Sequence, residues 1–198
     1  MAVTAACGVV LVAACNRADR AEVDTALGQA TQAVATAVDS VAGRVGGQEY
    51  TNAELVGFVN AYNDAEVEVG QLAQTKATDT QVRDFARRIA SEHRALKTEV
   101  TNAAQRLNIA PTMPTADENL PEDHQTGMRD LAALPKGAAF DRAFVKHEVK
   151  MHRKVLDEVE DALRRNRNQE IRPVLEKARD GIRAHLTTAE ELERKLGT

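Results

Sequence analysis

The stretch VRDFARRIASEHRALKTEVTNAAQRL, residues 82–107, decides the fold, because its apolar side chains recur in alternating steps of four and three residues. This spacing keeps side chains on one face of an α-helix, and a repeat near 3.5 residues suits helices packed almost side by side. The central residue of the stripe, His93, is therefore predicted to point toward a protein core. The stripe consists of Val82, Ala86, Ile89, His93, Leu96, Val100, Ala103 and Leu107.

Three other stretches carry the same kind of stripe, each with one polar residue near its centre: Glu66, His152 and His185. Four polar residues in the middle of four apolar stripes need a common explanation. The three stripes are Leu55, Val59, Tyr62, Glu66, Val69 and Ala73; then Val145, Val149, His152, Leu156, Val159 and Leu163; then Ile171, Leu175, Ala178, Ile182, His185, Ala189, Leu192 and Leu196.

The helix boundaries predict an all-α fold. Thr51 and Glu54 form a candidate capping box before the first helix, Asp79 or Thr80 is a candidate N-cap for the second, and Pro173 fits the first turn of the last. Two tight turns and one long, proline-containing connection indicate two antiparallel helical hairpins, as in a ferritin-like four-helix bundle with one long crossover. The expected helices cover about 52–75, 80–108, 140–165 and 169–195, with a short helix at 122–133 and an irregular loop at 110–121.

The N-terminus resembles a bacterial lipoprotein signal. Residues 1–14 are nearly all small or apolar, and Val12-Ala13-Ala14 precedes Cys15 as in a lipobox. No Lys or Arg occurs in the first four residues, and a buried apolar helix segment is the alternative interpretation. We expect a signal peptide at 1–14 and a lipid on Cys15 that anchors the chain to the periplasmic face of a bacterial membrane, the outer membrane being favoured.

Residues 15–47 are predicted to form a lipid-anchored spacer helix that ends in a hinge at Gly43, Gly46 and Gly47. The bundle then occupies 48–198. Cys7 would leave with the signal peptide, so the mature domain would hold no disulfide. The sequence leaves protein partners and a homo-oligomeric state open.

The amino-acid composition narrows the classes of function that the chain can have. The 198 residues are 43% hydrophobic and 28% charged, with 3% aromatics and no Trp, which fits a helical bundle with charged outer faces. A net charge of -4 and a pI near 5.8 give no reason to expect nucleic acid as a partner. No segment has the roughly 18 to 20 apolar residues that span a bilayer.

The central residues predict a metal site. One carboxylate and three imidazoles, from Glu66, His93, His152 and His185, suit a single divalent Zn, Fe, Mn or Cu ion without an organic cofactor. Glu148 lies one turn before His152 and can add an oxygen ligand. Further carboxylates that can orient imidazole N–H groups are Glu92, Glu68 and Glu190. His124, in the connecting segment, is expected to be a solvated surface residue.

Two alternatives stay open. The four residues can form a metal-free, hydrogen-bonded cluster in a structural or interaction protein of the envelope. A ferritin-type oxidase needs two ions and a Glu-x-x-His motif on two helices, yet residues 90, 149 and 182, three before each histidine, are Ala, Val and Ile. No nucleophile–base pattern or phosphate-binding loop suggests catalysis, so a binding function is favoured over an enzymatic one.

Several segments resemble the ferritin-like bacterial family of domain of unknown function 4142 (DUF4142). They are EVEVGQLA at 66–73, VRDFA at 82–86 with Glu92-His93, FDRAFV at 140–145 with His152, and His185-Leu186. The resemblance extends over about 52–196. It implies a four-helix ferritin-like fold in exported envelope proteins, many of them described as outer-membrane proteins. It implies no particular activity, because the biochemical role of the family is not established.

Overall fold

The computed structural model describes residues 43–45, 48–113, 120–166 and 168–197. The predicted signal peptide, Cys15 and most of the spacer helix lie outside the described residues. Two short strands come first, β1 (Gly43–Val45) and β2 (Gln48–Tyr50). The helices are α2 (Asn52–Lys76), α3 (Thr80–Arg106), α4 (Leu120–Ala133), α5 (Ala138–Arg165) and α6 (Arg172–Leu196).

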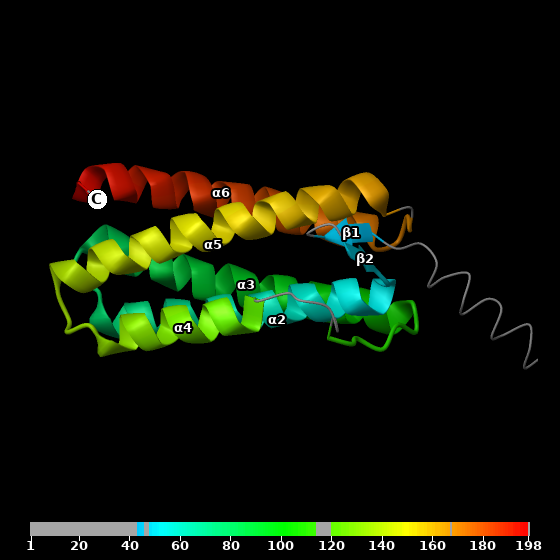
Figure 1. The fold of residues 1–198 in the computed structure, drawn as a ribbon, viewed down its shortest axis with the longest axis horizontal. Coiled ribbons are helices and arrows are strands. Elements are labelled where there is room, and N and C mark those ends of the chain that lie inside the picture. Colours follow the sequence, from blue (N-terminus) through cyan, green and yellow to red (C-terminus); the bar gives the residue numbers. More distant parts are fainter. Residues whose placement is uncertain (1–42, 46–47, 114–119, 167, 198) are drawn as a thin grey trace, which may run out of the picture. The chain divides into compact units, whose positions relative to one another are not determined.

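The four long helices form the predicted bundle (Figure 1). α2 packs against α3, and α5 packs against α6, so each pair is an antiparallel hairpin. The connection between the hairpins contains α4, which contacts α2 and α5. The expected all-α, ferritin-like fold with one long crossover is confirmed.

The helix ends follow the predicted local chemistry. Thr51 Oγ1 accepts from the backbone N–H of Glu54 (3.2 Å), and the Glu54 carboxylate accepts from the backbone N–H of Thr51 (3.0 Å). The Asp79 carboxylate accepts from two backbone N–H groups at the start of α3. Pro173 lies in the first turn of α6.

A buried carboxylate joins the two hairpins at one end of the bundle. Asp141, in the first turn of α5, accepts hydrogen bonds from the backbone N–H groups of Thr78 and Asp79 (both 2.9 Å) and from the Thr78 hydroxyl (2.7 Å). These donors belong to the turn between α2 and α3. Because all three point at one charged acceptor, the turn is fixed against α5.

The apolar core is divided into two clusters. One contains Tyr62 of α2 and Ile182 of α6, and the other contains Val69 of α2 and Ala189 of α6. The predicted polar residues lie between these positions along each helix. The bundle therefore has an apolar layer, a polar layer and a second apolar layer along its axis.

Of the three glycines of the expected hinge, Gly43 lies in β1, and Gly46 and Gly47 lie outside the described residues. β1 and β2 pair antiparallel, with Gly43 opposite Tyr50 and Val45 opposite Gln48, and β1 lies against α5. The buried ring of Tyr50 stacks on Phe58 of α2, with centroids 6.3 Å apart. This apolar contact stabilises an ordered start to the domain.

Two smaller differences concern the connection between the hairpins. α4 begins at Leu120, so Pro121 lies in its first turn and not in the irregular loop. The loop also packs more closely than expected: a Cβ on Gly57 of α2 would lie 1.9 Å from the carbonyl oxygen of Thr112. Glycine is therefore required where this loop crosses α2. None of the described helices is both long and apolar enough to cross a membrane.

Candidate metal centre

The structure places all five predicted ligands in the polar layer, and none has more than 2% of its surface exposed. They form two overlapping groups whose candidate ligand atoms lie within 4.8 Å of one another. One group is His93, His152 and His185; the other is Glu66, Glu148 and His152. His152 is common to both.

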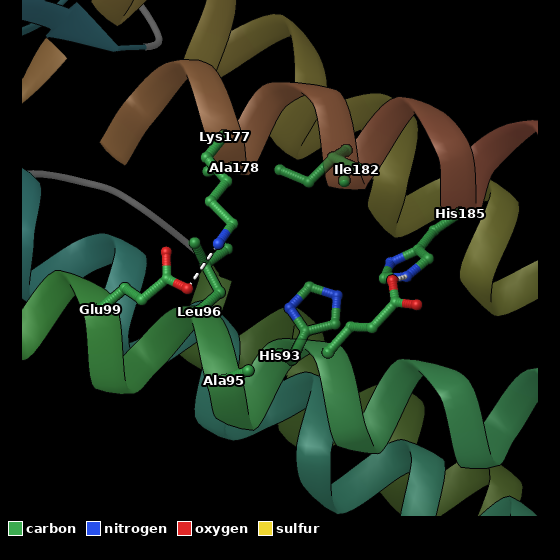
Figure 2. Close-up of a pocket in the computed structure, with 10 residues that line it drawn as sticks. His93, Ala95, Leu96, Glu99, Lys177, Ala178, Ile182 and His185 are labelled. Atoms are coloured by element: carbon green, nitrogen blue, oxygen red, sulfur yellow. Dashed lines mark hydrogen bonds and ion pairs between the residues drawn. The ribbon is translucent and has the colours of Figure 1, made fainter. Parts of the chain in front are cut away.

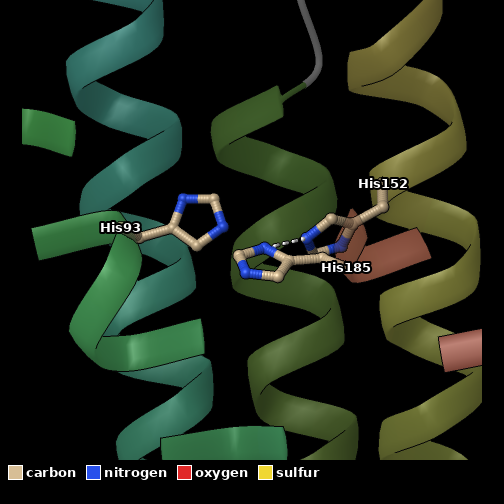
Figure 3. Close-up of side chains that lie close together, drawn as sticks. All are labelled: His93, His152 and His185. Carbon is tan, nitrogen blue, oxygen red and sulfur yellow. Dashed lines mark hydrogen bonds between the residues drawn. The ribbon is translucent and has the colours of Figure 1, made fainter. Parts of the chain in front are cut away.

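The three imidazoles come from three different helices and converge at one point (Figure 3). His93 lies on α3, His152 on α5 and His185 on α6. Their ring centroids are 5.1 to 5.8 Å apart. Nε2 of His152 lies 3.3 Å from Nδ1 of His185. Both hairpins therefore contribute to the cluster.

In each imidazole, one ring nitrogen lies within hydrogen-bond distance of an oxygen atom, and this contact fixes the orientation of the ring. Nδ1 of His93 lies 2.8 Å from Oδ1 of Asn63, and Nε2 of His185 lies 2.7 Å from a carboxylate oxygen of Glu92. Nδ1 of His152 lies 3.0 Å from the backbone carbonyl oxygen of Glu148. Oxygens of these kinds accept hydrogen bonds, so these ring nitrogens carry the protons and donate.

The remaining three nitrogens then carry lone pairs. Nε2 of His93 has no hydrogen-bond partner among the described residues, and Figure 3 shows its ring directed toward the other two. Nε2 of His152 and Nδ1 of His185 face each other at 3.3 Å, and with the other nitrogen of each ring donating to its oxygen, both present lone pairs to the space between the rings. Of these three nitrogens, Nε2 of His93 is buried without a hydrogen-bond partner among the described residues, and three convergent lone pairs in a buried site repel one another. A cation that accepts all three relieves both costs.

Burial keeps these imidazoles neutral. It lowers the pKa of His93 well below its ordinary value, and the neighbouring His152 and His185 lower it further. Burial likewise lowers the pKa of His152 to about 3. For His185 burial lowers the pKa, while the Glu92 carboxylate acts in the opposite direction. Neutral imidazole is the form that binds metal ions, so the site needs no deprotonation of histidine at neutral pH.

A pair of carboxyl groups lies on the other side of His152. A carboxyl oxygen of Glu148 is 3.3 Å from Nδ1 of His152. Burial raises the pKa of Glu66 to about 7, and burial together with the charge of Glu66 raises the pKa of Glu148 well above its ordinary value. Tyr62, whose ring meets His93 and His152 edge-on, closes this side of the layer. A bound cation would favour the charged form of both carboxyl groups.

The structure corrects part of the prediction for the residues around the histidines. Of the three carboxylates proposed to orient imidazoles, Glu92 contacts His185, but Glu190 pairs with Arg153 (2.6 Å) and Glu68 lies beside His124 (3.3 Å). His124 is half-buried against this carboxylate instead of fully solvated, because α4 packs on α2.

Sequence reasoning missed two residues of this region. Asn63 is fully buried and orients His93. Because Asn63 lies one turn before Glu66 in the sequence, it is expected on the same face of α2, and this spacing was the signal that could have identified it. His147 of α5 is half-buried beneath α4, where its ring occupies the space that a Cβ on Gly127 would need. His147 does not belong to either candidate ligand group among the described residues.

Comparisons with known proteins concern the fold and the family. A family model described as "Domain of unknown function (DUF4142)" matches residues 36–192. A solved structure, the crystal structure of a DUF305 fragment from Deinococcus radiodurans, is similar with a TM-score of 0.60. Its sequence is 18% identical, and the alignment covers 73% of this chain and 97% of that chain, so the likeness shows the fold alone. None of the curated proteins matches the chain.

Proposed function

Because the chain belongs to the DUF4142 family, which is defined by a domain of unknown function, we propose its function from the site itself: His93, His152 and His185 bind one divalent transition-metal ion. The observation that carries the proposal is the convergence of three buried imidazoles, each with its other ring nitrogen against an oxygen acceptor. Metal-binding histidines commonly have such acceptors, which fix the tautomer and make the ligand nitrogen more basic.

The donor set favours particular ions. Three neutral imidazoles without a thiolate suit Zn(II), Fe(II), Mn(II) or Cu(II). The carboxyl pair of Glu66 and Glu148, which belongs to the other candidate group, compensates the charge of the ion from beside His152. A second ion beside the two carboxyl groups would share His152 with the first, because His152 belongs to both candidate groups. The arrangement therefore supports one ion in preference to two.

Metal content tests this proposal. The full chain is loaded with each of the four ions, freed of excess ion, and analysed for bound metal. About one ion per chain is expected for the wild type, and His93→Ala and His185→Ala should each lose it, because two imidazoles hold an ion far less tightly than three. His124→Ala is the matched control and should retain the ion. A folded wild type that keeps no ion, or a His93→Ala variant that keeps it, would refute the site.

The cellular role rests on different observations. We infer that the protein handles metal ions or protects against metal stress in the bacterial envelope, held by a lipid on Cys15 to the periplasmic face of the outer membrane. The apolar segment 1–14 and the lipobox-like residues before Cys15 support this inference.

Membrane fractionation tests the anchor. The wild type is expected in the membrane fraction, and Cys15→Ser should move most of the protein to the soluble fraction, because acyl chains provide stable anchoring. Cys7→Ser, which changes the other cysteine, should leave the distribution unchanged. A Cys15→Ser variant that stays with the membrane would contradict lipid anchoring at this residue.

A further inference from the structure

A pocket of about 260 Å³ lies between α3 and α6 and reaches the histidine cluster (Figure 2). His93 and His185 line its inner end, whereas His152 does not line it. At the other end an ion pair joins Lys177 to Glu99 (2.5 Å), and both side chains are exposed to solvent. The pocket thus connects two of the three imidazoles with the surface.

The wall between these two ends is apolar. It is formed by Ala95 and Leu96 of α3 and by Ala178, Gly181 and Ile182 of α6. Gly181 borders open space in this wall, since a Cβ built on it would meet no atom within 4 Å. An alanine at this helical position would be more favourable for the helix than glycine. A side chain much larger than a methyl group at this position would extend into the open space.

The inner end holds an unsatisfied ligand atom. His93 is buried, lines the pocket, and has no hydrogen-bond partner for Nε2 among the described residues. An ion that binds this nitrogen and Nδ1 of His185 therefore lies at the end of the pocket. Three protein nitrogens leave at least one coordination position for an outside ligand, as in zinc sites with three protein ligands.

We propose that this pocket admits a small exogenous ligand, a molecule of a few heavy atoms with one nitrogen or oxygen donor, which binds the metal ion at its open position. This inference rests on the proposed metal site and adds the identity of the ligand class and its route. The volume exceeds that of one water, whose share of the liquid is about 30 Å³. Apolar walls offer few hydrogen bonds to ordered water, so a compact ligand displaces the water at little cost.

Azide is a suitable probe, because it is small and has a nitrogen donor. The full chain is loaded with Co(II), whose visible absorption changes when a ligand is added, and titrated with azide. Wild-type protein should show a saturable spectral change. Gly181→Leu should weaken azide binding by about tenfold or more while the cobalt content stays the same, because the leucine fills the open space. Gly181→Ala, which adds one methyl group, should bind azide almost as well as the wild type.

Thr188→Leu is the matched control on the same helix. Thr188 lines a second hollow between α3 and α6, of about 420 Å³, which contains none of the three histidines. Azide binding to Thr188→Leu should therefore equal that of the wild type. Equal azide binding by Gly181→Leu would overturn the route, and a cobalt-loaded wild type that ignores azide would overturn the open position. A wild type that holds no cobalt would refute the metal site itself, and the present inference would fall with it.

Discussion

Adding a divalent ion that binds the three imidazoles is expected to raise the free energy of unfolding by about 2.7 kcal/mol when the free ion is at 100 times its dissociation constant. The ion stabilises the folded state because its ligands come from α3, α5 and α6 and converge only when both hairpins are packed. Each kcal/mol shifts the melting temperature of a domain of this size by about 2–4 °C, so the midpoint should rise by roughly 5–11 °C. Thermal unfolding of one sample with the ion and one with a chelator measures this difference.

His152→Ala should abolish the ion-dependent shift, since His152 belongs to both candidate ligand groups. The shift is measured within each variant, so any stability that the alanine itself costs does not enter the comparison. His147→Ala is the matched control on the same helix: burial also lowers the pKa of His147, to about 4, but its ring packs against Gly127 of α4. This variant should keep the full shift. A His152→Ala protein that is still stabilised by the ion would place the metal elsewhere in the chain.

Replacing both buried carboxyl groups, with Glu66→Met and Glu148→Met together, is expected to stabilise the metal-free protein by about 1–4 kcal/mol at pH 8. Burial raises the pKa of Glu66 from 4.5 to about 7 and that of Glu148 well above its ordinary value. The folded state therefore binds more protons than the unfolded chain above pH 4.5, and the stability of the wild type falls as the pH rises through 7. The gain from the double substitution should accordingly be larger at pH 8 than at pH 5. Urea unfolding at the two pH values measures it.

Asp141→Ala is a control that is expected to lower the free energy of unfolding, whereas the double Met substitution should raise it. This buried carboxylate accepts three hydrogen bonds, so its loss leaves donors of the α2–α3 turn unsatisfied and should lower the free energy of unfolding by about 1–3 kcal/mol.

The double Met substitution has a second readout, weaker metal binding, because the charge that compensates the ion is gone. If the double variant is instead less stable at pH 8, the carboxyl pair serves the fold, as expected for a metal-free structural cluster.

The helical repeat was sufficient to predict the fold. Apolar residues spaced by three and four, as in 82–107, decide which face of a helix is buried, and local capping by Thr51 and Asp79 decides where helices begin. The family resemblance is likewise confirmed over most of the domain. The strands at 43–50 escaped prediction, because two three-residue segments are too short to show a period.

The site was predicted only as a set of buried positions. The positions of Glu66 and His93 within their apolar stripes show that both side chains face the core. Which ring nitrogen of His93 is left without a hydrogen-bond partner depends on side-chain rotamers and on neighbours from other helices. The contact between Asn63 and His93 and the separation of Glu68 from the cluster both follow from how the helices are rotated against each other. The pocket beside Gly181 depends on the spacing of α3 and α6, which a single stripe does not specify.

The distribution of the three imidazoles over the two hairpins also bears on when, during biosynthesis, an ion can be selected. A growing chain that has completed only α2 and α3 presents one imidazole of the trio, His93, and α5 adds a second. The third arrives with α6, which follows α5 in the chain. If the three imidazoles bind an ion as proposed, a partly synthesised chain would bind it weakly, and the ion would be selected where the second hairpin packs against the first.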